Sequence, residues 1–211
     1  MLLIDVSGSL DFGTSGQLKR ECATEIAATL AFSAIQNNDK IGVIFFSDHI
    51  EKYIAPKKGR KHILYLIREM LTFTPNSKRT EVGVSLEYLN KVMKRRCTAF
   101  VISDFYTRKD FSQELRIANK KHDVVAIQVY DPRAKEMPDV GLMKVVDAET
   151  GHEMYIDTHD ARLRKVHNKY WEEREMRLHE MLSQSHVDSV AIATDDDYVK
   201  MLMTLFSKRN R

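Results

Sequence analysis

The sequence predicts an α/β fold: a doubly wound, mostly parallel sheet with one antiparallel edge strand, helices on both faces and an added β-hairpin. Short apolar, β-rich runs alternate with longer segments of helical periodicity, which is the order typical of this class. The 211 residues are enough to bury one full core. A composition of 43% hydrophobic and 30% charged residues excludes a disordered or collagen-like chain.

The elements follow one another along the chain. A buried strand at 2–6 precedes a helix at about 16–37, in which apolar residues recur every four positions. The strand at 41–46 is almost wholly apolar, as expected for a strand covered on both faces. The segment at 49–55 follows after so short a connection that we expect it to be the antiparallel edge strand. The remaining elements are expected to be helices at 60–73 and about 82–93, a strand at 99–102, a helix at 111–121, a strand at 124–130, a hairpin at 143–146 and 154–156, a long charged helix at about 160–184, a strand at 189–193 and a final helix.

Helical spacing also predicts which side chains face the core. We expect Val166 and Tyr170 on the inward face of the long charged helix, and Leu71 on the apolar face of the helix at 60–73. The run Asp195–Asp197 lies between a strand and a helix, so we interpret it as a helix cap rather than as a metal-binding run.

The chain is expected to be a single domain over residues 1–211, because it shows no internal repeat and no linker. The apolar start meets Asp5 at once, so it is not a signal peptide, and we expect a fragment that lacks an upstream region. No window approaches the roughly 18–20 apolar residues of a membrane span, so this fragment is expected to make no membrane contact. Cys22 and Cys97 stand in unrelated contexts, which favours a reducing, cytoplasmic location. A net charge of +3 and basic clusters interleaved with acidic residues do not indicate a nucleic-acid partner.

Oxygen-bearing side chains gather at the predicted strand ends. The first strand ends in Asp5-x-Ser7-x-Ser9, another strand ends just before Asp104, and a polar loop ends at Thr80 before a helix. Ligands of doubly wound sheets bind beyond the carboxyl ends of the strands, where the strand order reverses. With the common strand order, these five side chains meet at that edge.

Two carboxylates and three hydroxyls, without histidine or cysteine, suit a hard cation such as Mg²⁺ (or Mn²⁺). Neutral hydroxyls hold an ion without cancelling its charge, so the ion can accept an acidic group from another molecule. The residues therefore predict a non-enzymatic interaction site. Asp and Ser also form turns and caps, so the short motif alone is weak, and the hypothesis depends on the convergence of the three loops.

The motif and its neighbours resemble the metal-ion-dependent adhesion site of von Willebrand factor A domains. The segments at 11–14, 38–43, 46–47 and 56–60 are similar to a bacterial subgroup, domain of unknown function family fifty-eight, and the similarity continues through 187–189 and the final helix. The resemblance implies metal ligation, direct or nearly so, by Asp5, Ser7 and Ser9, direct ligation by Thr80 in the engaged state, and a role through water for Asp104.

The resemblance also implies a setting for the domain. Members of the family usually carry amino-terminal membrane segments, so a missing upstream region is expected to tether the domain to the inner membrane. Their genes commonly neighbour MoxR-type AAA+ ATPases, which suggests such an ATPase as the protein partner, in assembly or maturation. Many relatives have glycines before the threonine, whereas Lys78 and Arg79 stand here and are expected to compete with the cation.

Two alternatives stay open. A haloacid-dehalogenase-like phosphatase also begins with Asp at a strand end, but it needs a second Asp where Ser7 stands. Metal-dependent phosphoryl hydrolysis is therefore the rival class, and a scaffold with a vestigial site is the third hypothesis. The chain contains neither Gly-x-x-x-x-Gly-Lys-Ser/Thr nor Gly-x-Ser-x-Gly.

Overall fold

The structure, a computed structural model, describes residues 1–14, 16–107 and 109–209, so the last two positions of the expected domain lie outside it. Within these ranges the strands are β1 (Leu2–Asp5), β2 (Ile41–Phe46), β3 (Ile50–Lys57), β4 (Thr98–Ser103), β5 (Asp123–Tyr130), β6 (Leu142–Val146), β7 (Glu153–Asp157) and β8 (Asp188–Ala193). The helices are the 3-10 helix η1 (Gly8–Asp11), α1 (Lys19–Gln36), α2 (Arg60–Thr72), α3 (Val82–Val92), α4 (Ser112–Lys121), α5 (Pro132–Lys135), α6 (Ala161–Gln184) and α7 (Tyr198–Arg209). Every element expected from the sequence is present, whereas η1 and α5 were not expected.

Six strands form one sheet in the order β3-β2-β1-β4-β5-β8, and every neighbouring pair is parallel except β2 with β3. The expected α/β class and antiparallel edge strand are thus confirmed. The hairpin is also present, but β6 and β7 form a two-stranded sheet of their own rather than extending the main sheet. In the main sheet β1 lies between β2 and β4, so the strand order reverses beside β1.

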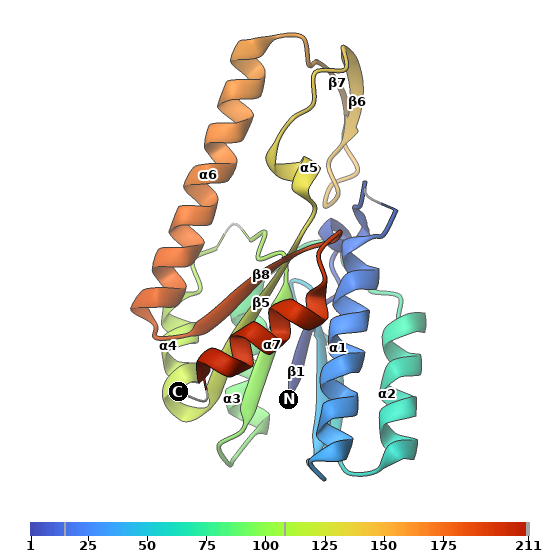
Figure 1. Cartoon of the computed structure of the whole chain (residues 1–211), viewed down its shortest axis with the longest axis vertical. Helices are drawn as coiled ribbons and strands as arrows, with labels where there is room; N and C mark the ends of the chain where they lie inside the picture. The colour runs from blue at the N-terminus through green and yellow to red at the C-terminus, as the bar shows by residue number, and fades with distance from the viewer. Residues whose placement is uncertain (15, 108, 210–211) are drawn as a thin grey trace.

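Side chains alternate between two cores, one on each face of the sheet. In β1, Leu2 and Ile4 join the core that α1, α2 and α7 cover, whereas Leu3 joins the core of α3, α4 and the end of α6. This alternation follows from the two-residue period of a strand. Helices on both faces explain why β1 and β2 are apolar almost throughout (Figure 1).

The first half of α6 extends beyond the sheet together with the β6–β7 hairpin (Figure 1). A helix of 24 residues is about 36 Å long, whereas a six-residue strand such as β8 spans only about 20 Å. Leu178 and Leu182 therefore reach the core, but Val166 is 70% and Tyr170 46% exposed. The expectation that Val166 and Tyr170 face inward was wrong, because an apolar stripe does not show where the sheet beneath it ends.

Two smaller expectations have different outcomes. Leu71, in the last turn of α2, is exposed rather than packed, and so does not share the burial of Ile63 and Met70. Asp197 Oδ1 accepts the N–H of Lys200 at 3.2 Å, so the capping residue of the acidic run is Asp197. Across the described ranges, every helix lacks the uninterrupted apolar length that a membrane span needs.

Asp131, at the end of β5, holds the segment that leads from the first strand to α1. Its fully buried carboxylate accepts the N–H of Thr14 at 2.6 Å, the hydroxyl of Thr14 at 2.8 Å and the N–H of Arg133 at 2.8 Å. Thr14 and Asp131 are 117 residues apart in sequence. These bonds therefore fix the loop after η1 against the carboxyl end of β5.

We expect Asp131→Ala to lower the free energy of unfolding by about 2–4 kcal/mol, because two backbone N–H groups and a hydroxyl lose a charged acceptor. Urea denaturation followed by circular dichroism measures this change. Asp195→Ala, at an exposed carboxylate in the loop before α7, is the control and should leave the midpoint unchanged. Equal midpoints for the two variants would show that Asp131 does not hold the loop.

Candidate functional site

The segment after β1 is a tight, buried turn. The N–H of Ser7 donates to Oδ1 of Asp5 at 2.9 Å, and the hydroxyl oxygens of Ser7 and Ser9 lie 3.1 Å apart. None of the three residues is more than 7% exposed. The structure therefore brings the carboxylate and both hydroxyls of the Asp-x-Ser-x-Ser motif together at the carboxyl end of β1.

Asp104 lies at the same edge, because β4 is the parallel neighbour of β1. The hydroxyl of Ser103 donates to Oδ2 of Asp5 at 2.5 Å and accepts the N–H of Phe105 at 2.8 Å. This serine joins the two strand ends directly. Asp5 and Asp104 are thus neighbouring buried carboxylates, as the expected strand order implies.

The loop that carries Thr80 is held beside the site motif by backbone hydrogen bonds on both sides of this residue. The carbonyl oxygen of Lys78 accepts the N–H of Gly8 at 2.9 Å, and the N–H of Glu81 donates to the carbonyl oxygen of Ser47 at 3.0 Å. Thr80 is 7% exposed, and among the described residues its buried hydroxyl oxygen has no hydrogen-bond partner. Buried hydroxyls are nearly always satisfied, so this oxygen is available to a ligand.

Glu51, which the sequence did not single out, anchors the first part of that loop. Its carboxylate accepts the hydroxyl of Ser47 at 2.8 Å and the N–H groups of Asn76 and Ser77 at 3.0 and 3.1 Å. A charged residue on an edge strand is expected to point to solvent, so the sequence carries no signal for this role.

A buried ammonium group pairs with one of the site carboxylates. Nζ of Lys19, in the first turn of α1, lies 2.6 Å from Oδ2 of Asp104, and both side chains are only 6% exposed. Lys78 and Arg79, the cations expected to compete at the site, are exposed residues of the Thr80 loop. The cation that forms an ion pair with a site carboxylate is therefore Lys19, which sequence reasoning missed.

These contacts give the two carboxylates opposite acidities. Burial and, next to it, the negative charge of Asp104 raise the pKa of Asp5 to about 7, against the opposing effect of hydrogen bonds from Ser103 and Ser7. Burial acts in the same direction on Asp104, but the charge of Lys19 and hydrogen bonds from Lys19 and Tyr106 outweigh it, so the pKa of Asp104 is lowered.

The turn of the β6–β7 hairpin lies over the site motif. A methyl group added to Gly8 would stand 2.5 Å from the carbonyl oxygen of Ala148, in that turn, and 3.0 Å from Cβ of Lys78. No side chain fits in this space, so the close approach requires glycine. Figure 1 shows the hairpin descending from the projecting end of α6 toward η1.

The donor chemistry fits a hard cation. Among the described residues no group of three or more His, Cys, Asp or Glu side chains is placed to hold a metal ion, so an ion here would depend on hydroxyl ligands. The adjacent hydroxyls of Ser7 and Ser9, the unpartnered hydroxyl of Thr80 and the carboxylate of Asp5 supply oxygens of the kind that Mg²⁺ prefers.

Three comparisons relate the chain to known proteins. A family model described as "Protein of unknown function DUF58" matches residues 1–177. The chain is 34% identical over 152 residues to the uncharacterized protein Mb1516 of Mycobacterium bovis; the match covers 71% of this chain and 48% of the relative, so the chain spans about half the length of that protein.

Two solved structures share the fold. BatB, a conserved hypothetical protein of Bacteroides thetaiotaomicron, superposes with a TM-score of 0.64 at 15% identity, over 98% of this chain and 96% of BatB. The VWA domain of SpRpn10 superposes with a TM-score of 0.52 at 11% identity, over 98% and 92%. At these identities the likeness shows the fold alone. The chain therefore belongs to the DUF58 family and has the fold of a von Willebrand factor A-like domain.

Proposed function

We propose that this domain binds a divalent cation, Mg²⁺ or Mn²⁺, and through it an acidic residue of a partner protein. Asp5, Ser7, Ser9 and Thr80 would hold the ion, and Asp104 would act through water, as the resemblance to adhesion sites implies. The observation that carries the proposal is the buried hydroxyl of Thr80, which has no partner among the described residues and lies in a loop bonded to Gly8 of the motif. The ion would supply a positive charge to which an acidic group of the partner can bind.

Recognition without bond-making suits the state of the two carboxylates better than hydrolysis does. The general acid or base of a phosphatase must be free to exchange a proton with substrate. Asp104 is instead paired with Lys19 at 2.6 Å and accepts the N–H of Tyr106 at 3.0 Å. The position two residues after Asp5 holds Ser7, a hydroxyl that cannot serve this role at neutral pH.

The Lys19–Asp104 pair supports a second candidate, a scaffold that holds no ion. The ammonium of Lys19 already neutralises one of the two site carboxylates, so the charge of that carboxylate is balanced without a metal ion. A metal titration distinguishes the two candidates, because only the cation-binding domain would give a heat of binding.

The resemblance supports a MoxR-type AAA+ ATPase as the partner, with the domain assisting assembly or maturation. It equally supports a cytoplasmic domain tethered to the inner membrane through a region outside this chain. Because the chain spans about half of its curated relative, these assignments of the whole protein belong to the proposal.

Thr80→Val tests the site with little structural change, because it removes only the hydroxyl oxygen. We expect the variant to be as stable as the wild type, since that oxygen has no hydrogen bond to lose, but to bind Mn²⁺ at least tenfold more weakly. Asp5→Ala should abolish the heat of binding. Isothermal titration with Mn²⁺ and Mg²⁺ measures both effects.

Unchanged Mn²⁺ affinity in Thr80→Val would remove the hydroxyl from the ligand set. Absence of binding to the wild type would favour the scaffold. Turnover of phosphate esters that Asp104→Ala abolishes would identify a hydrolase.

The raised pKa of Asp5 makes the stability depend on pH. Between pH 3.8, the ordinary value of the group, and about 7, the folded state keeps a proton that the unfolded state has lost. In the presence of EDTA, we therefore expect the wild type to lose a few kcal/mol of unfolding free energy relative to Asp5→Asn as the pH rises from about 4 to about 7, with no further loss above it. Urea denaturation of both proteins across this range measures the difference. Parallel curves would contradict the protonated state of Asp5.

Replacing Lys19 tests the buried pair. We expect Lys19→Met to lower the unfolding free energy by about 3–5 kcal/mol at pH 7 with EDTA, because the charge of Asp104 is left buried and unpaired. Added Mn²⁺ should restore part of this loss, and the Mn²⁺ affinity should rise at least tenfold. Lys165→Met, at an exposed lysine of α6, is the control. If both variants unfold and bind alike, the pair does not set the charge of the site.

A further inference from the structure

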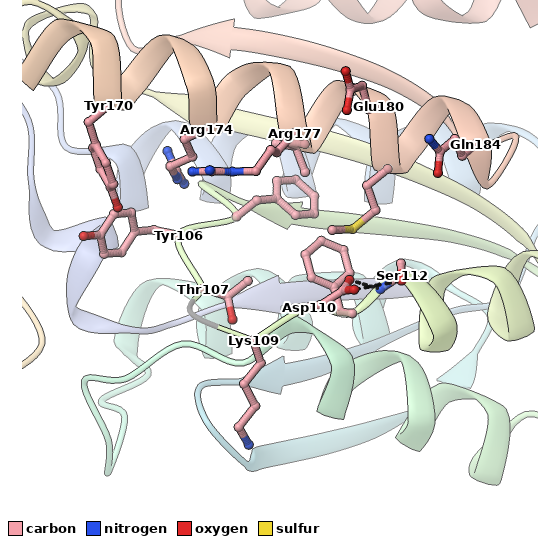
Figure 2. A pocket seen from close by; sticks show the side chains of 14 residues that line it. Tyr106, Thr107, Lys109, Asp110, Ser112, Tyr170, Arg174, Arg177, Glu180 and Gln184 are labelled. Atoms are coloured by element: carbon pink, nitrogen blue, oxygen red, sulfur yellow. Dashed lines mark hydrogen bonds between the residues drawn. The ribbon is translucent and has the colours of Figure 1, made fainter.

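A cavity of about 680 Å³ adjoins the candidate site, between α6 and the segment that follows β4 (Figure 2). Its floor is apolar and belongs to the core, with Phe105, Phe111 and Leu178 all at most 9% exposed. The cavity begins at the site itself, because Phe105 directly follows Asp104 and Nη2 of Arg174 donates to the carbonyl oxygen of Asp104 at 2.7 Å. We call this space the α6 groove.

One face of α6 supplies the polar wall of the α6 groove. Tyr170, Arg174 and Arg177 project from that face toward the segment after β4 (Figure 2). The guanidinium of Arg174 stacks on Tyr106 and Trp171, at 4.8 and 4.7 Å from the ring centres, and its Nη1 has no hydrogen-bond partner among the described residues. Within the same part of the chain, Arg177 makes no ion pair.

Among the described residues, the other charges along the α6 groove are already engaged or lie further away. Lys109 is held by Glu81 at 2.7 Å and points away from α6. Asp110 accepts the N–H of Ser112 at 2.8 Å, at the start of α4. Glu180 stands one helical turn beyond Arg177. The end of the groove nearest Asp104 therefore carries two arginines that form no ion pair with another described residue, although Arg174 also feels the charge of Asp104.

We propose that the α6 groove binds a short acidic and apolar segment of the same partner that engages the ion, and this rests on the proposed function. One carboxylate of the segment completes the coordination of the ion, and a second pairs with Arg177 and Arg174. An apolar side chain between them covers Phe105 and Leu178. Guanidinium groups suit carboxylates because they offer paired N–H donors. A bare phosphate would leave the apolar floor and most of the volume unfilled.

The single tryptophan of the chain, Trp171, gives a readout, because it stacks on Arg174, which lines the α6 groove. The probe is an acetylated and amidated hexapeptide of alternating glutamate and leucine, titrated in the presence of Mn²⁺ while tryptophan fluorescence is recorded. We expect saturable binding that weakens at least tenfold in Arg177→Gln. Lys165→Gln, on the projecting half of α6, should bind as the wild type does, and the glutamine–leucine hexapeptide should not bind.

These experiments distinguish the contribution of the α6 groove to peptide binding from that of the metal ion. Binding that depends on Arg177 in EDTA as well as in Mn²⁺, and in Asp5→Ala, keeps the α6 groove and removes the ion from recognition. Calorimetric Mn²⁺ binding with equal peptide affinities in wild type and Arg177→Gln overturns the groove and leaves the proposed function standing. The proposal of a peptide ligand is overturned in favour of a phosphate ligand if inorganic phosphate changes the fluorescence in a way that requires Arg177 and the hexapeptide does not change it.

Discussion

The buried ion pair between Lys19 and Asp104 is the interaction on which the candidate site depends. Removing two charges from water is costly, and the cost is recovered only where geometry and further hydrogen bonds are good. Here the 2.6 Å contact is supplemented by the N–H of Tyr106 on the same carboxylate. The pair also ties the start of α1 to the end of β4, across 85 residues, at the edge where β1 ends. Asp5 is the other buried carboxylate of the site, and burial together with the charge of Asp104 raises its pKa.

Most of the fold could be predicted because each element carries a local signal. The bounds expected for β2 coincide with the observed Ile41–Phe46, since an apolar run between polar residues leaves no other choice. The start of α1 was placed too early, because Leu18 takes the N-cap position, where polar residues are usual, and the side chain of Glu21 accepts its N–H. Val166 and Tyr170 were misplaced for a different reason: their burial depends on how far the sheet extends beneath α6, which no local pattern contains.

The candidate site divides in the same way. Asp5, Ser7, Ser9, Thr80 and Asp104 could be placed together because strand ends and a helix start meet wherever the common strand order holds. Lys19 and Arg174 could not, because each reaches Asp104 from a helix that is 85 or 70 residues distant in sequence, and nothing in their own segments marks them. Charge neutralisation at this edge is thus a tertiary property, whereas the placement of the oxygen-bearing side chains follows from motif and topology.

The contact between Gly8 and the carbonyl oxygen of Ala148 has a consequence for how the family can vary. The hairpin is inserted between β5 and α6, yet its turn closes against a residue near the start of the chain. A side chain at position 8 and a hairpin of this length and course are therefore mutually exclusive. Where a relative has a shorter hairpin, or one that bends elsewhere, a side chain at this position would meet no such obstacle. The requirement for glycine at position 8 therefore depends on the course of a segment 140 positions away in sequence.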